Sequence, residues 1–169
     1  MQAKIYHSDE DLYIVGADQL LMAVWSVAPE MSHMKVLAQA GDRHRSSLRG
    51  EKQVFVNVVL DGTPNFSEEV RAEATRHSQR YAPFRAAAAH VICIKGFRGI
   101  AVRSFMSTMI LLARPVTPAK VFDSMDSASN WLLTYLQPRE SWSRESLILL
   151  YQSAYRVLRP STSAAAASP

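Results

Sequence analysis

The stretch of residues 86–136 constrains the fold more than any other part of the chain. An apolar run of strand length (87–94) ends at a Lys-Gly pair and is followed by a helical apolar pattern over 97–114. A short strand (120–122) and a second helix (127–136) come next, with few residues between them. Two buried strands joined by one crossover helix form a parallel βαβ unit. The sequence therefore predicts an α/β sheet.

The patterns before this stretch complete the predicted sheet. Residues 12–15 and 20–28 are apolar and are separated by a short Gly/Asp turn, which predicts an antiparallel hairpin. Residues 53–60 are apolar on both faces, as in a central parallel strand. Helices are predicted over 29–41 and 66–82. The predicted fold is α/β, with a mixed, mostly parallel central sheet of about five strands, an N-terminal antiparallel hairpin and four flanking helices.

The chain of 169 residues suggests one domain with additions at its C-terminus. We expect a domain over residues 1–138 and an appended amphipathic helix over 139–158. The last residues, 159–169, are of low complexity and are predicted to be disordered.

The charge of the chain gives little indication of nucleic-acid binding. The net charge is +4 and the isoelectric point is about 9.4. The densest basic run, Arg43-His44-Arg45 with Arg49 and Lys52, lacks interleaved aromatic residues. We interpret it as a solvated loop, or as a frayed extension of the preceding helix, and expect no nucleic-acid partner.

Apolar segments and cysteine usage favour a cytoplasmic protein. No apolar stretch approaches the roughly 20 residues that span a bilayer, so no membrane span is expected. The N-terminus is polar and acidic, unlike a secretory signal. The single cysteine, Cys93, cannot form an internal disulfide and is predicted to be a small buried hydrophobe.

Complete catalytic and metal motifs are absent from the sequence. The five histidines have no helical pairing and no second ligand at motif spacing, so no metal site is expected. No phosphate-binding loop and no GxSxG elbow occurs. The sequence therefore predicts a protein that is not an enzyme and has no cofactor.

Two polar segments at strand ends are candidate sites. Lys95, Gly96 and Arg98 follow a strand and open a helix, which predicts an anion site; a tight turn is the competing interpretation. At the end of the strand over 53–60 stands a second group, where α/β sheets place functional residues. Its members are interpreted as a partner-binding surface with a phosphorylatable hydroxyl, or as turn and cap residues: Asp61, Thr63, Asn65 and Ser67.

The helix over 97–114 carries two apolar stripes. One stripe is predicted to be buried: Ile100, Ala101, Phe105, Thr108 and Leu112. The other is Val102, Met106, Met109 and Ile110, and a dimer interface or the C-terminal helix is expected to cover it. The interface candidates are Phe97, Val102, Met106, Met109, Leu150 and Tyr151.

Three motifs in this order resemble the STAS fold, and more specifically its SpoIIAA-like, STAS/Sec14-like branch. They are VNVVLDGTP (56–64), AHVICIKGFRGIAVRSF (89–105) and KVFDSMDSASNWL (120–132). The resemblance covers roughly residues 11–137. It implies a non-enzymatic regulatory and signalling domain.

The resemblance also implies a switch. In anti-sigma-factor antagonists of this family, a serine at the start of the helix after the central strand is phosphorylated, within the pattern Asp-Ser-Ser/Thr-Gly. Asp61 matches the aspartate, but no serine stands at the acceptor position, and Thr63 and Ser67 are the only nearby substitutes.

Three functions remain open from the sequence. The first is a regulatory module that binds a protein partner and self-associates as a homodimer. The second is a binder of a small apolar ligand or lipid, as in Sec14-like domains, with Met106 and Met109 lining the pocket. The third is an enzyme with an unrecognised site at the strand ends.

Overall fold

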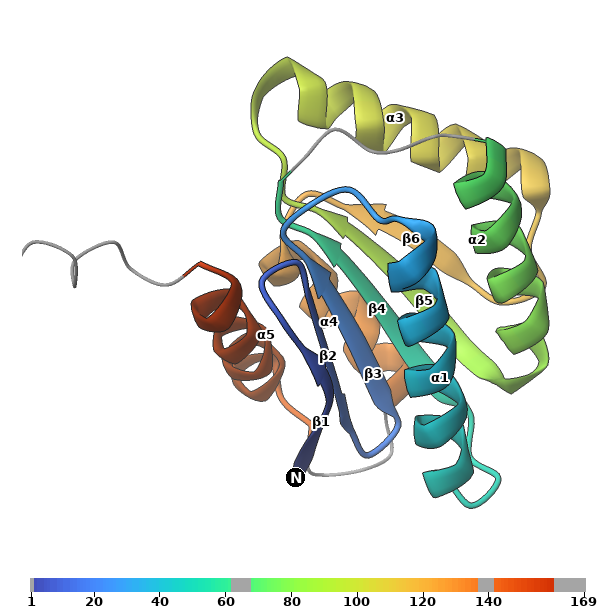
Figure 1. Cartoon of the computed structure of the whole chain (residues 1–169), viewed down its shortest axis with the longest axis vertical. Coiled ribbons are helices and arrows are strands. Elements are labelled where there is room, and N and C mark those ends of the chain that lie inside the picture. The colour runs from blue at the N-terminus through green and yellow to red at the C-terminus, as the bar shows by residue number, and fades with distance from the viewer. Residues whose placement is uncertain (1, 62–67, 137–141, 160–169) are drawn as a thin grey trace, which may run out of the picture.

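The computed structural model describes residues 2–61, 68–136 and 142–159. These residues form one six-stranded sheet with helices on both faces (Figure 1). The strands neighbour one another in chain order: β1 (Ala3–Ser8), β2 (Leu12–Ala17), β3 (Leu20–Trp25), β4 (Gln53–Val59), β5 (Arg85–Ile92) and β6 (Ala119–Phe122). The helices are α1 (Met31–Ser47), α2 (Glu68–Tyr81), the short 3₁₀ helix η1 (Ala82–Phe84), α3 (Gly96–Ala113), α4 (Met125–Leu136) and α5 (Arg144–Leu158).

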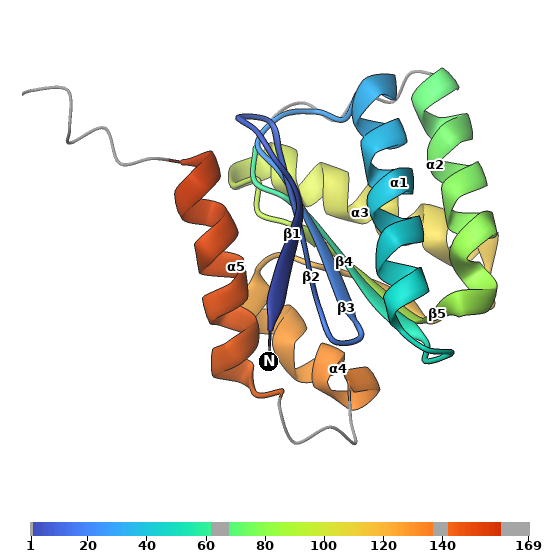
Figure 2. The same cartoon turned by 60° about the horizontal axis from the view of Figure 1, so that its bottom comes forward.

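The sheet is antiparallel at its beginning and parallel afterwards. β1, β2 and β3 pair antiparallel, and β3, β4, β5 and β6 pair parallel. The crossover helices α1, α2 and α3 lie on one face, and α4 and α5 cover the other (Figure 2). This confirms the predicted α/β fold. β1, a strand of six residues, lies at the edge of the sheet beside the predicted hairpin.

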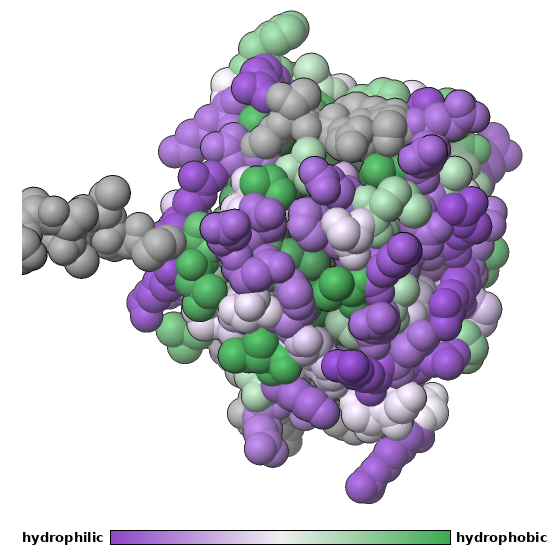
Figure 3. Space-filling model, viewed as in Figure 1, coloured by the Kyte–Doolittle hydropathy of each residue, from purple (hydrophilic) through white to green (hydrophobic). Residues whose placement is uncertain are grey.

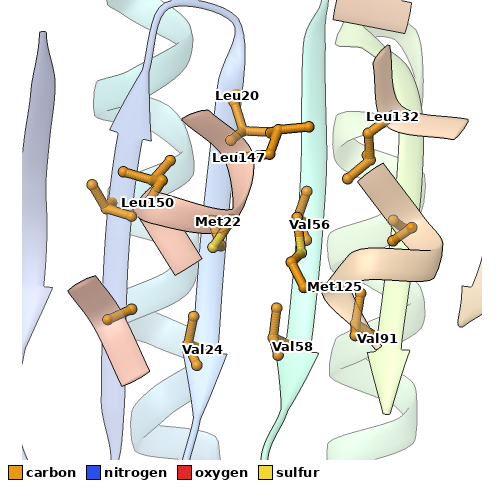
Figure 4. Close-up of a cluster of buried hydrophobic side chains, with 14 of the residues drawn as sticks. Leu20, Met22, Val24, Val56, Val58, Val91, Met125, Leu132, Leu147 and Leu150 are labelled. Carbon is orange, nitrogen blue, oxygen red and sulfur yellow. The ribbon is translucent and has the colours of Figure 1, made fainter. Parts of the chain in front are cut away.

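The helix predicted to be appended packs onto the sheet. The apolar side of α5 meets β2, β3 and α4, and Leu147 is fully buried (Figure 4). It belongs to the same buried cluster as Met22, Val56 and Leu132. Leu150, predicted as an interface residue, is 5% exposed in the same cluster, so its side chain serves the core of this chain. The part of the predicted tail from residue 160 onward lies outside the described residues.

The basic run at residues 43–45 is helical, so of the two interpretations the helix extension is confirmed and the solvated loop was wrong. α1 continues to Ser47, and His44 is turned inward at 2% exposure. The His44 Nε2 lies 3.0 Å from the Asp18 carbonyl, and the Gln53 amide lies 2.8 Å from its Nδ1. These two contacts tie the last turns of α1 to the β2–β3 turn and to the start of β4.

The predicted buried stripe of α3 was also wrong. Among the described residues of this helix only Gly99 is buried, while Ile100, Phe105 and Leu112 are exposed. A Cβ at Gly99 would stand 1.7 Å from the Ile94 carbonyl oxygen, so the glycine lets the helix backbone approach the end of β5. α3 rests on β5 and on the four-residue edge strand β6. This support is narrow, and most of the helix circumference therefore faces outward.

Candidate functional site

A cleft of about 810 Å³ opens at the carboxyl ends of the parallel strands β4 and β5. Leu60 and Asp61 border it after β4, and Cys93, Ile94 and Lys95 border it after β5. The opposite wall is the C-terminal half of α5, with Tyr151, Gln152, Tyr155 and Arg159. Arg98, in the first turn of α3, completes the lining. Carboxyl ends of parallel strands are where α/β sheets usually bind ligands.

The charge in this cleft is mainly positive. Among the described residues, three cationic side chains line it, Lys95, Arg98 and Arg159, together with one carboxylate, Asp61. An Arg159 guanidinium nitrogen donates to the Asp61 carboxylate over 3.1 Å and joins α5 to the end of β4. The Lys95 side chain makes no capping hydrogen bond to the first turn of α3.

The thiol and the tyrosine in the wall of the cleft are neutral groups. The Cys93 Sγ lies 3.8 Å from the Tyr151 hydroxyl oxygen. Burial raises the pKa of both groups, so both keep their protons at neutral pH. A protonated thiol is a poor nucleophile, and the pair is suited to hydrogen bonding rather than to covalent catalysis.

The outward side of α3 is a second unusual surface. Phe97 is 84% exposed, and both Leu111 and Leu112 are more than 70% exposed. Val116, just beyond the helix, is 97% exposed. By contrast, the side of the molecule formed by α1 and α2 is mostly hydrophilic (Figure 3). Several large exposed apolar side chains along one helix often mark an interaction surface.

The predicted site residues divide between these two surfaces. Asp61, Lys95 and Arg98 line the same cleft, which joins the two segments that the sequence presented separately. Tyr151 also lines it, and Gly96 opens α3 at its edge with φ near 69°. The interface candidates on α3 differ: Phe97 and Met109 are exposed, whereas Val102 and Met106 are partly buried. Thr63, Asn65 and Ser67 lie outside the described residues.

The sequence analysis missed the contribution of α5 to the cleft. Tyr155 and Arg159 were not among the candidates, although both line it. Tyr151, Tyr155 and Arg159 follow one another at i, i+4 and i+8, which places them on one side of a helix. That spacing is a signal in the sequence, but only the packing of α5 shows that this side reaches the ends of β4 and β5.

Three histidines elsewhere are held neutral by the fold. Burial lowers the pKa of His44 to about 4 and that of His77 to about 3, the latter with help from the nearby charges of Arg85 and Arg80. His90, beside Asn57 on β4, has its pKa lowered to about 4, again mainly by burial. Within the described residues, no group of three or more His, Cys, Asp or Glu side chains is placed to hold a metal ion.

Fold and surfaces together define an α/β domain with a cationic cleft at its strand ends and an uncovered apolar helix. No protein-family model, no curated protein and no solved structure matches this chain. The resemblance to the STAS family therefore stays a prediction.

α3 also bears on the expectation that no membrane span exists. Within the described residues, this one helix is long and apolar enough to cross a membrane, by length and composition only. The sequence analysis counted a shorter apolar stretch because Arg98 and Arg103 interrupt the run. The absence of a membrane span stays a prediction.

Proposed function

We propose that this protein is a non-enzymatic docking module that binds an apolar helix of a partner protein along the outward side of α3. The observation that carries the proposal is that α3 has a single buried residue, Gly99, although most of its side chains are apolar. Large exposed apolar surfaces on small domains are usually covered by a partner.

The pattern of side chains on the outward side favours a helix as the occupant. Ala101, Ser104 and Thr108 are exposed and succeed one another at i, i+3 and i+7, along one line of the helix. Large exposed residues flank this line, with Ile100 and Leu111 on one side and Phe105 and Leu112 on the other. A line of small residues between ridges of large ones is the surface into which a second helix packs.

Charge indicates what the ends of that partner helix carry. Residues 95–122 contain five basic residues and no acidic residue. Lys95 and Arg98 stand at the start of α3, and Arg114 follows its last residue. The helix has 18 residues and is therefore about 27 Å long at 1.5 Å per residue, so its two ends are both positively charged. A partner with acidic groups at both ends of an apolar face complements this arrangement.

A second copy of this chain is a poorer occupant. In an antiparallel pair of α3 helices, Lys95 and Arg98 of one copy meet Arg114 of the other, and like charges at close range oppose association. An anionic membrane complements the positive charge of α3, but it does not explain the line of small residues along the middle of the outward side. Homodimerisation and membrane binding are therefore outcomes of the test below.

Site-specific photo-crosslinking in the native cell tests this proposal. A photoreactive amino acid replaces Phe97 or Leu112 on α3, and Leu149, which is 62% exposed on α5, serves as the matched control position. We expect both α3 positions, but not position 149, to crosslink to the same protein. Binding of that purified protein should weaken at least tenfold in Lys95→Glu/Arg114→Glu and not in the control Arg49→Glu/Lys52→Glu. Crosslinks only to lipid, only to a second copy, or equally from position 149 would refute the proposal.

A further inference from the structure

Arg85 is a buried cation at the end of the molecule where α1 and α2 finish and β4 and β5 begin (Figure 1). It is the first residue of β5 and is only 6% exposed. Its guanidinium forms no ion pair and no hydrogen bond with any other residue that the structure describes. A buried charge normally has a partner of opposite charge, because the loss of its hydration is costly. We propose that Arg85 binds the carboxylate of a small organic acid.

Two aromatic rings explain how the fold holds the charge without an anion. The Arg85 Cζ lies 4.3 Å from the centroid of the Phe55 ring and 5.3 Å from that of the Tyr81 ring. The faces of such rings attract a cation. They offer no acceptor lone pair, however, and a guanidinium carries five N–H donors. The aromatic contacts therefore stabilise the charge and leave its hydrogen-bonding capacity unused.

Neighbouring ionisable groups do not supply the anion. The Asp42 carboxylate accepts from Arg80 over 2.7 Å and from the Tyr81 hydroxyl over 2.8 Å. His77, whose ring centroid is 4.5 Å from that of Tyr81, has its pKa lowered to about 3 by burial and by the charges of Arg85 and Arg80, so it is neutral. Burial lowers the pKa of Arg85 to about 10, so Arg85 keeps its charge at neutral pH. The site therefore offers a single positive charge, which suits a monoanion.

The outer edge of the guanidinium is accessible. The Arg85 Nε is enclosed and has no partner. The two Nη atoms also lack acceptors, but they are not enclosed in the same way, so they account for part of the exposed surface of the residue. Two N–H groups on one edge of a guanidinium match the two oxygens of a carboxylate. The small exposed area favours a small acid over a macromolecular surface.

Other cations nearby favour the approach of an anion. Arg45 and Arg80 both act on the Tyr81 phenol, whose ring the Arg85 guanidinium contacts. The Arg45 Cζ lies 4.4 Å from the centroid of the Phe84 ring, and Phe84 precedes Arg85 in the chain. Clustered charge of one sign raises the local concentration of the opposite ion.

An NMR titration of the purified full chain with acetate tests this inference without any partner protein. Chloride replaces acetate so that the ionic strength stays constant. We expect saturable shifts of the Arg85 Nε–H resonance and of the backbone amides near it, with a Kd of about 10 mM or tighter. Acetamide, which has nearly the shape of acetate but no charge, should give no saturable shift. Inorganic phosphate should bind at least threefold more weakly than acetate.

Substitutions assign the binding to the guanidinium. Arg85→Met keeps an unbranched side chain between the rings and removes an unpaired buried charge, so we expect it to fold. Acetate binding should be lost in Arg85→Met, weakened at least threefold in Arg85→Lys, and unchanged in the matched control Arg43→Met, which alters an exposed arginine of α1. Urea unfolding checks that each variant is folded, and the Nε–H titration of the parent chain stands without any variant.

Four results would overturn the inference. They are no saturation of the Arg85 resonance at about 100 mM acetate, an equal response to acetamide, phosphate binding as tight as acetate binding, and unchanged acetate affinity in Arg85→Met. Saturable shifts that lie away from Arg85 would show an adventitious ion only. None of these results depends on docking along α3, so the two proposals stand or fall separately.

Discussion

Removal of apolar side chains from the outward side of α3 should hardly change the stability of the isolated protein. Leu112 is 72% exposed, so about a quarter of its surface is covered. Full burial of a leucine side chain contributes roughly 1.5–3 kcal/mol, so the covered part of Leu112 contributes only about 0.5 kcal/mol. Leu112→Ala should therefore lower the free energy of unfolding by less than about 1 kcal/mol, well below the value for a core leucine.

Leu132 on α4 is the matched control, because it is the same residue type in a helix but is fully buried. Leu132→Ala removes that burial and leaves a cavity, which typically costs about 2–5 kcal/mol. Urea unfolding followed by circular dichroism measures both variants against the parent chain. The two free-energy changes should differ by at least about 1 kcal/mol, the gap between these ranges.

A loss above about 2 kcal/mol for Leu112→Ala would refute the reasoning, because it places Leu112 in a covered environment. Unfolding at two protein concentrations tells which environment that is. A loss that grows with protein concentration indicates cover by a second copy, since association stabilises the folded state by mass action. A loss independent of concentration indicates that α3 is covered within the chain.

Two further predictions concern the parts that position these surfaces. Gly99→Ala should lower the free energy of unfolding, measured in urea, by about 1–3 kcal/mol, as overpacking does. The reason is that the alanine Cβ would stand 1.7 Å from the Ile94 carbonyl oxygen. Unchanged stability would contradict the close approach of α3 to the end of β5. The free energy of unfolding should fall as the pH drops from about 6.5 toward 4. In the folded state the pKa values of His44, His77 and His90 are lowered to about 4, about 3 and about 4, so these side chains stay neutral over most of this range. The same histidines in the unfolded chain bind protons there, which favours unfolding. Urea midpoints that do not change between pH 7 and pH 4.5 would show that these imidazoles accept protons without unfolding.

Local patterns in the sequence were sufficient for the fold class. The apolar run before Lys95 and the short strand at residues 120–122 flank a helical segment, and only a parallel crossover joins them within one sheet. The same logic placed Asp61 and Lys95 at strand ends. That both line one cleft follows from the pairing of β4 with β5, which is a pairing of neighbours in the chain.

Tertiary structure decided which apolar residues are core and which are surface. Periodicity shows that α3 has apolar residues on most sides, but it does not show how wide the surface beneath the helix is. β6 is a four-residue edge strand, so α3 is covered only along Gly99, Val102, Arg103, Met106 and Ile110, and its remaining large apolar residues are exposed. Likewise, the spacing of Tyr151, Tyr155 and Arg159 defines one side of α5, and only the packing of that helix on β2 and β3 brings this side to the cleft. Periodicity is a property of a single element, whereas burial depends on the size and position of the element opposite it, and that information is not local in the chain.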